Sequence, residues 1–250
     1  MKRRNFLKKS AIMGIAALAA DIPQASEQKA KPNKNKAPSS AAVRGNKLTP
    51  PDRGPIPVAF AISNGATMID FAGPWEVFQD VVVKDKARRV SRPGFKLYTV
   101  SQKTEPIIAS AGMKIIPDYT FENAPFPKVV VVGAQTGSPA MQEWLKKIID
   151  TTDVLMSVCT GAFHLARAGL LSGAPATTHH DFFDAFEKQF ADVKLQRGLR
   201  FVEGPTVSTA GGLTSGIDLA LRVVERYFGR EAAHRTAVYM EYQSDGWIVR

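Results

Sequence analysis

The sequence contains a single cysteine, Cys159, among its 250 residues, and only 4 histidines. One cysteine cannot form an internal disulfide, and its place far from the N-terminus excludes a lipid anchor on a cysteine near the start of the chain. Uninterrupted apolar runs are also short, and none reaches the roughly 18 residues that a membrane-spanning helix requires. We therefore expect a globular body that does not enter a membrane.

Negative charge is scarce only at the start of the chain, and this explains the formal net charge of +10. Residues 1–53 contain 12 Lys/Arg but 3 Asp/Glu, whereas residues 54–250 contain 21 and 20. A nearly neutral body without a basic stripe gives no electrostatic footprint for a phosphate backbone. We expect no nucleic-acid partner.

The first 20 residues have the order of a signal peptide, in which a basic segment precedes a short apolar one and an Ala-rich stretch. Arg3 and Arg4, followed by Phe-Leu-Lys at 6–8, are typical of a twin-arginine leader, although Lys2 stands where Ser or Thr is usual. An ordinary secretory leader is the alternative, and either route predicts a periplasmic or otherwise exported protein. Residues 21–54 have almost no bulky apolar side chains and are predicted to form a flexible linker.

From residue 55 onward, short apolar runs alternate with amphipathic segments, which predicts βαβ units in a single α/β domain over 55–250. The predicted sheet is doubly wound and mostly parallel, with helices on both faces. Strands are predicted at 56–62, 95–101, 128–132, 154–158 and 206–209. Helices are predicted at 74–80, 139–149, 160–168, 181–190, 216–227 and 230–242, with Pro74 in a first helical turn.

The strand that ends at Val158 runs directly into Cys159-Thr-Gly-Ala162 and a helix. This order predicts a nucleophile elbow, a tight turn that presents one side chain at the carboxyl edge of the sheet. Backbone N–H groups at the start of the helix are expected to lower the pKa of the thiol. The alternative is a buried structural cysteine that acts as a small apolar side chain.

Four segments resemble motifs of the ThiJ/PfpI superfamily, whose members have a class I glutamine amidotransferase-like domain. They read SVCTGA at 157–162, ATTH at 176–179, DFAGPWEVF at 70–78 and TAGGLTSGIDL at 209–219. The pattern is most similar to the isonitrile hydratase-like subgroup. The resemblance implies a flavodoxin-like fold with a nucleophile elbow and, by analogy alone, a possible homodimer.

The resemblance also implies roles for individual residues. Cys159 is the expected nucleophile, and Asp70, expected just before the first helix, is the acid that touches its sulfur. Thr160 is expected to offer its backbone N–H and its hydroxyl to an oxyanion-like site. Helix capping is the alternative role for both Asp70 and Thr160.

Departures from the family pattern concern the turn after residue 132 and the histidines. Val132-Gly133-Ala134 stands where the family usually has Pro-Gly-Gly, so Gly133 and Ala134 are weaker candidates for a second backbone donor. Thr160 stands where proteases of the superfamily have His, which leaves His179 or His180 as the histidine able to approach from the next strand end. His180 replaces the usual Trp. No metal site is expected, because the 4 histidines and the cysteine lack regular ligand spacing, and His164 and His234 are expected to be structural.

Two functions are compatible with these residues. The first is hydration of a small isonitrile to an N-substituted formamide, with Cys159 as nucleophile, Asp70 as proton donor and no cofactor. The second is a non-catalytic module that binds a ligand or senses oxidation of Cys159, as the amidotransferase-like domains of some regulators do. Because the chain ends at Arg250, we expect no appended helix-turn-helix pair.

Overall fold

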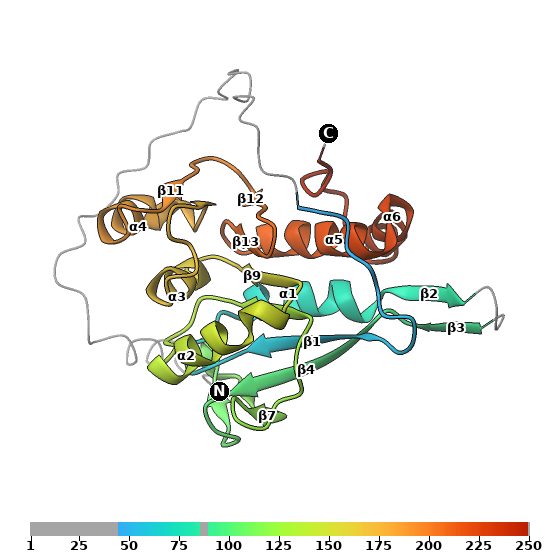
Figure 1. Cartoon of the computed structure of the whole chain (residues 1–250), viewed down its shortest axis with the longest axis horizontal. Coiled ribbons are helices and arrows are strands. Elements are labelled where there is room, and N and C mark those ends of the chain that lie inside the picture. Colours follow the sequence, from blue (N-terminus) through green and yellow to red (C-terminus); the bar gives the residue numbers. More distant parts are fainter. Residues whose placement is uncertain (1–44, 86–89, 250) are drawn as a thin grey trace, which may run out of the picture. The chain divides into compact units, whose positions relative to one another are not determined.

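The computed structural model describes residues 45–85 and 90–249, and the predicted signal peptide lies outside these residues. A seven-stranded sheet forms its centre, with the strand order β12-β13-β9-β8-β1-β4-β7 (Figure 1). The strands of this sheet are β1 (Ile56–Ala61), β4 (Phe95–Ser101), β7 (Tyr119–Thr120), β8 (Val129–Val132), β9 (Val154–Ser157), β12 (Phe201–Val202) and β13 (Val207–Ala210).

Neighbouring strands of this sheet run parallel, except that β12 is antiparallel to β13. After β1 the chain adds β4 and β7 on one side, and it then returns to place β8 on the other side of β1. The direction of strand addition therefore reverses between β1 and β8. In open α/β sheets ligands bind at such a reversal, beyond the carboxyl ends of the strands.

Helices cover both faces of the sheet because successive strand residues point to opposite sides. Phe60, Val131 and Met156 pack with α1 (Met68–Gln79), α5 (Ser215–Phe228) and α6 (Arg230–Tyr239). Ala61, Val130 and Leu155 pack with α2 (Pro139–Ile148) and α3 (Gly161–Arg167), on the opposite face (Figure 1). The expected doubly wound, mostly parallel α/β architecture is confirmed, and the remaining helix is α4 (Phe183–Gln189).

The first helix begins earlier than the sequence predicts. α1 starts at Met68, so Pro74 lies inside it rather than in its first turn, and Asp70 lies in that first turn rather than before the helix. Proline removes one backbone donor from the helix. Packing supports the helix across this position, because the buried Val77 and Phe78 join the core formed with α5.

Three short strand pairs that the sequence does not predict lie outside the central sheet. They are the antiparallel pairs β2 (Val82–Asp85) with β3 (Val90–Pro93) and β5 (Ile107–Ile108) with β6 (Lys114–Ile115), and the parallel pair β10 (Pro175–Ala176) with β11 (Lys194–Leu195). Part of the segment expected as a linker contacts α5. The carbonyl of Asn46 accepts a hydrogen bond from Arg226 Nε at 2.9 Å, and the Leu48 N–H donates to the Arg226 carbonyl at 2.9 Å.

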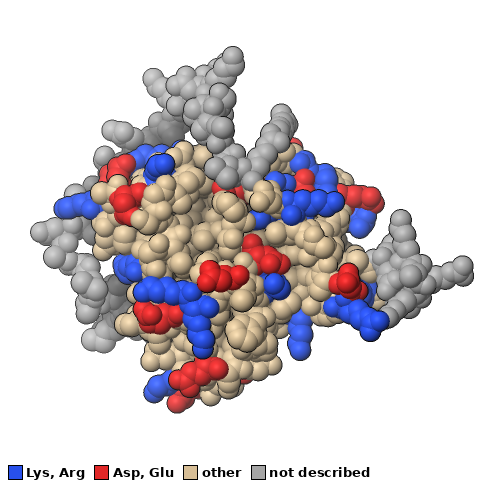
Figure 2. Space-filling model, viewed as in Figure 1, with Lys and Arg blue, Asp and Glu red and all other residues tan. Residues whose placement is uncertain are grey.

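Charged side chains of both signs are mixed over the described surface. Figure 2 shows Lys and Arg interspersed with Asp and Glu on this face, with no broad field of one sign. The mixture agrees with the nearly neutral charge of the body. No helix among the described residues combines the length and the apolar character that a membrane crossing needs.

Candidate active site at the cysteine elbow

The turn between β9 and α3 has the geometry of a nucleophile elbow. Cys159 has a φ angle of 59°, in the left-handed region that is uncommon for residues other than glycine. Gly161, two residues later, passes so close to β8 that a Cβ atom there would collide with the Val132 carbonyl oxygen. The elbow therefore depends on a strained cysteine backbone and on a glycine that lets α3 start against the sheet.

The backbone of Cys159 is held on both sides. Its N–H donates to the Gly211 carbonyl at 2.8 Å, and its carbonyl accepts a hydrogen bond from Thr178 Oγ1 at 2.9 Å. Gly211 belongs to the motif at 209–219, and Thr178 belongs to the motif at 176–179. Because their bonds satisfy the polar groups of the turn, the strained backbone of Cys159 is fixed in place.

Asp70 reaches the elbow from the first turn of α1. Its side chain is fully buried, and its Oδ2 accepts a hydrogen bond from the Ala134 N–H at 2.9 Å. A Cβ at Gly133 would lie 2.8 Å from the Asp70 Cβ, so the glycine permits this close approach. Among the described residues, none donates a hydrogen bond to Oδ1 of Asp70. A proton on the Asp70 carboxyl could be donated to the neighbouring Cys159 sulfur, which would satisfy both buried groups.

Burial shifts the pKa values of both reacting groups upward. It raises the pKa of Asp70 to about 6, while the Ala134 N–H and the Cys159 thiol oppose the shift. Burial and the nearby Asp70 carboxylate raise the pKa of Cys159 to about 11, against hydrogen bonds from Thr160 and the backbone of Leu213. Because the two groups interact, they titrate as a pair that carries one negative charge through the neutral range.

The raised pKa of the thiol differs from the lowering that the sequence predicts. The expectation rested on the start of α3, but α3 begins two residues beyond Cys159 and is only 7 residues long. Desolvation of the thiol in a residue that is 8% exposed has a larger effect than these few backbone dipoles. A reactive thiolate at neutral pH therefore requires that the single proton of the pair lie on Asp70.

Thr160 and the turn after β8 lie beside the elbow, and they contact different groups of the site. The backbone and the side chain of Thr160 lower the pKa of the Cys159 thiol, and Thr160 makes no side-chain capping bond to α3. The N–H of Ala134 is already bonded to Asp70. The N–H and hydroxyl of Thr160 remain candidates for an oxyanion-like site. The N–H of Ala134 instead orients the Asp70 carboxyl group.

His179 lies beside the cysteine elbow. Its ring packs on the turn after β13, where a Cβ at Gly212 would collide with it. Thr178, the residue before it, bonds Cys159, and both line a cavity of about 360 Å³ with Gly211, Gly212 and Leu213. The cavity also contains Arg200 and the hydroxyls of Thr214 and Ser215. A small molecule bound there would lie next to the residues that hold the elbow.

The sequence profile of the DJ-1/PfpI family matches residues 57–226, which is more than half of the chain. The chain belongs to the DJ-1/PfpI family. Its curated relatives include the isonitrile hydratase of Pseudomonas putida, 28% identical over 193 residues that cover 75% of this chain and 78% of the relative. They also include the HTH-type transcriptional regulator CdhR of Pseudomonas aeruginosa, 32% identical over 59% of this chain and 45% of the regulator. The chain therefore spans less than half the length of that regulator.

Solved structures of the DJ-1/PfpI family share the fold. A ThiJ/PfpI family protein from Pseudomonas syringae has a TM-score of 0.64 and 25% identity, covering 86% of this chain and 83% of its own. Drosophila melanogaster DJ-1beta has a TM-score of 0.63 with 17% identity, covering 76% of this chain and 100% of its own, and it supports the fold alone. The flavodoxin-like architecture is confirmed by these neighbours.

The histidines near the elbow differ in their surroundings: His164 is buried in α3, whereas His179 and His180 lie in a turn before α4. Burial lowers the pKa of His164, whose Nε2 lies 3.1 Å from the Gln135 carbonyl, so a neutral structural role in α3 is supported. His179, His180 and Asp181 place potential ligand atoms within 4.8 Å of one another. These atoms already bond locally, since His179 Nδ1 accepts the Asp181 N–H at 3.2 Å and His180 Nε2 lies 3.1 Å from Asp181 Oδ1. The contacts are those of a capped turn.

Proposed function

We propose that this DJ-1/PfpI protein is a cysteine-dependent hydratase that converts a small isonitrile to the N-substituted formamide. The buried Asp70 carboxyl beside the Cys159 elbow, with a pKa of about 6, is the observation that carries the proposal. General acid–base catalysis works best when the pKa of the group is near the working pH. The distant isonitrile hydratase relative supports the same chemistry.

In the proposed reaction the Cys159 thiolate attacks the terminal carbon of the isonitrile, and that carbon takes the proton from Asp70. The product is a neutral thioimidate with an ionised Asp70. Asp70 then removes a proton from water, whose oxygen adds to the same carbon, and the carbon–sulfur bond breaks. One proton of the water ends on the substrate nitrogen and the other on Asp70. Thiolate and carboxylic acid are thereby restored, and no cofactor takes part.

The reaction is tested by incubating the purified protein with small alkyl and aryl isonitriles and measuring formamide by mass spectrometry. We expect formamide from the parent and a loss of at least about 10³-fold in Cys159→Ala, because the nucleophile is absent. Ser172→Ala, on the surface, is the control and should retain the parent rate. Equal formamide with the parent and Cys159→Ala would exclude the proposed reaction.

A second function is favoured by a different observation. A transcriptional regulator is among the relatives, and Cys159 retains 8% of its exposure. A non-catalytic module that senses oxidation would gain oxygen on Cys159 under mild peroxide and form no formamide. The isonitrile assay combined with intact-mass measurement after peroxide separates the two functions.

We propose that the protein is exported by the twin-arginine route, on the basis of Arg3 and Arg4 ahead of a short apolar segment. Replacing both by lysine should leave the precursor in the cytoplasm, because that route requires the arginine pair. Fractionation followed by immunoblotting measures this, with Lys8→Arg and Lys9→Arg as the charge-matched control. Mature protein outside the cytoplasm in the double variant would instead support an ordinary secretory leader.

A further inference from the structure

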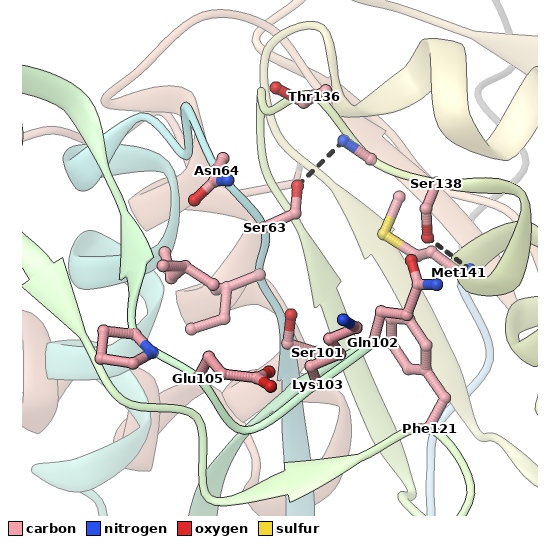
Figure 3. Close-up of a pocket in the computed structure, with 14 residues that line it drawn as sticks. Ser63, Asn64, Ser101, Gln102, Lys103, Glu105, Phe121, Thr136, Ser138 and Met141 are labelled. Atoms are coloured by element: carbon pink, nitrogen blue, oxygen red, sulfur yellow. Dashed lines mark hydrogen bonds between the residues drawn. The ribbon is translucent and has the colours of Figure 1, made fainter.

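A second cavity, of about 290 Å³, lies at the carboxyl edge of the sheet away from the cysteine elbow (Figure 3). Segments that follow β1, β4 and β8 form its walls, and Phe121 follows β7. Apolar side chains supply part of the lining, namely Ile62, Ile107, Phe121 and Met141. Neither Cys159 nor Asp70 belongs to this lining, so the cavity is not the site already described.

Ser101, the last residue of β4, presents a polar group to this cavity. The residue is only 5% exposed, and it belongs to the lining of the cavity. Figure 3 shows this hydroxyl pointing into the cavity. Because this hydroxyl lines the cavity, water can reach it there, and a ligand that accepts its hydrogen bond would take the place of that water.

Two further hydroxyls face the cavity with a proton available. Ser63 Oγ accepts the Gly137 N–H at 2.9 Å, and Ser138 Oγ accepts the Met141 N–H at 3.2 Å. A hydroxyl that accepts such a bond still has its own proton to donate. Ser138 is also the N-cap of α2, a helix of 10 residues whose positive end therefore points toward this region.

The charged residues of the cavity are Lys103 and Glu105, both exposed at its rim. No ion pair joins them in the part of the chain that the structure describes. The Asn64 Oδ1 accepts the Ile108 N–H at 2.9 Å, which leaves its amide group as another donor. Donors thus outnumber acceptors, and Glu105 is the single anionic side chain of the lining.

We propose that this cavity binds a small molecule through an anionic oxyacid group, a carboxylate or a phosphate. The anion lies among the hydroxyls of Ser63, Ser101 and Ser138, where hydrogen bonds to a charged acceptor are the strongest. The Lys103 ammonium balances its charge from the rim. The volume of about 290 Å³ limits the ligand to a small metabolite.

The proposal is tested by titrating the ¹⁵N-labelled full chain with sodium phosphate and, separately, sodium acetate at constant ionic strength set with chloride. Saturable shifts are expected at the amides of Ser101, Thr136 and Gly137, and the stronger of the two anions identifies the source of the oxyanion. Ser101→Ala should weaken binding about tenfold, through loss of one hydrogen bond to a charged group. Lys103→Gln should weaken it severalfold, whereas Lys114→Gln, an exposed lysine outside the cavity, should not.

The variant Glu105→Gln tests whether the ligand is negatively charged. It should tighten the binding of either anion, because it removes the one negative group of the lining. Lys103 and Glu105 are exposed, so their variants leave the core unchanged if Ser101→Ala fails to fold. The proposal is overturned if neither anion gives saturable shifts at these amides, or if Lys103→Gln and Glu105→Gln both bind as the parent does. Tighter binding of glycine than of acetate, weakened by Glu105→Gln, would likewise replace the anion with a zwitterion.

Discussion

Asp70→Asn is expected to lower isonitrile hydration by at least about 10³-fold without slowing the alkylation of Cys159 by iodoacetamide. An amide cannot transfer the proton that the proposed reaction needs. The substitution also removes the carboxylate that raises the pKa of the Cys159 thiol, and the new amide can still donate a hydrogen bond to the sulfur. Alkylation of Cys159 therefore does not slow. Formamide production and single-turnover alkylation measure the two effects separately. Asp80→Asn, at the end of the same helix, is the control and should change neither.

The pH dependence of alkylation sharpens this prediction. With the parent pKa of Cys159 at about 11, alkylation by a thiolate alone should keep rising with pH into the alkaline range. In Asp70→Asn the rise should begin at lower pH, because the like charge has gone. If Asp70→Asn hydrates isonitriles at the parent rate, Asp70 is not the proton donor, and His179 becomes the residue to test.

Gly161→Ala is expected to destabilise the fold by about 3 kcal/mol or more, because the new Cβ has no space. It would collide with the Val132 carbonyl oxygen and lie 2.9 Å from the Val132 carbonyl carbon. These are backbone atoms of β8, so relief requires that α3 move away from the sheet and that the elbow open. Urea unfolding monitored by circular dichroism measures the loss.

Gly198→Ala is the matched control for this substitution. Gly198 has a φ angle of 77°, and a Cβ there meets nothing within 4 Å. Its cost is therefore the backbone term alone, about 1 kcal/mol. A Gly161→Ala variant that unfolds at the parent midpoint would show that the elbow tolerates a side chain, and the close contact with β8 would not be what shapes it.

The sequence predicts the parts of this fold that are specified by local pattern. The Val-rich strands β8 and β9 are apolar throughout because both faces of the sheet are covered, and such runs are evident without a structure. β7 and β12 have only two residues each, so their pairing depends on neighbouring strands rather than on their own residues. The start of α1 was misplaced because Pro74 favours a first turn, whereas packing lets the helix continue through it.

The candidate site at Cys159 also combines features that local pattern predicts with features that depend on the assembled fold. The elbow at Cys159 and the approach of Asp70 follow from motifs, and the structure brings both together with Thr160. The bond from Ala134 to Asp70 and the contribution of the Leu213 backbone depend on loops that meet only after folding. The direction of the thiol pKa shift belongs to this second group, because desolvation is a property of the assembled core.

The buried carboxyl of Asp70 also affects how the stability of the protein depends on pH. An aspartate in the unfolded chain loses its proton near its ordinary pKa of 3.8, whereas the folded chain holds it until about 6. The folded state thus binds more protons between these values, so the stability that this group contributes is full in acid and is lost as pH rises through about 6. At neutral pH the ionised Asp70 opposes folding by at most about 3 kcal/mol. The group that is proposed to transfer the proton therefore makes the native state more resistant to unfolding in mildly acidic surroundings than at pH 7.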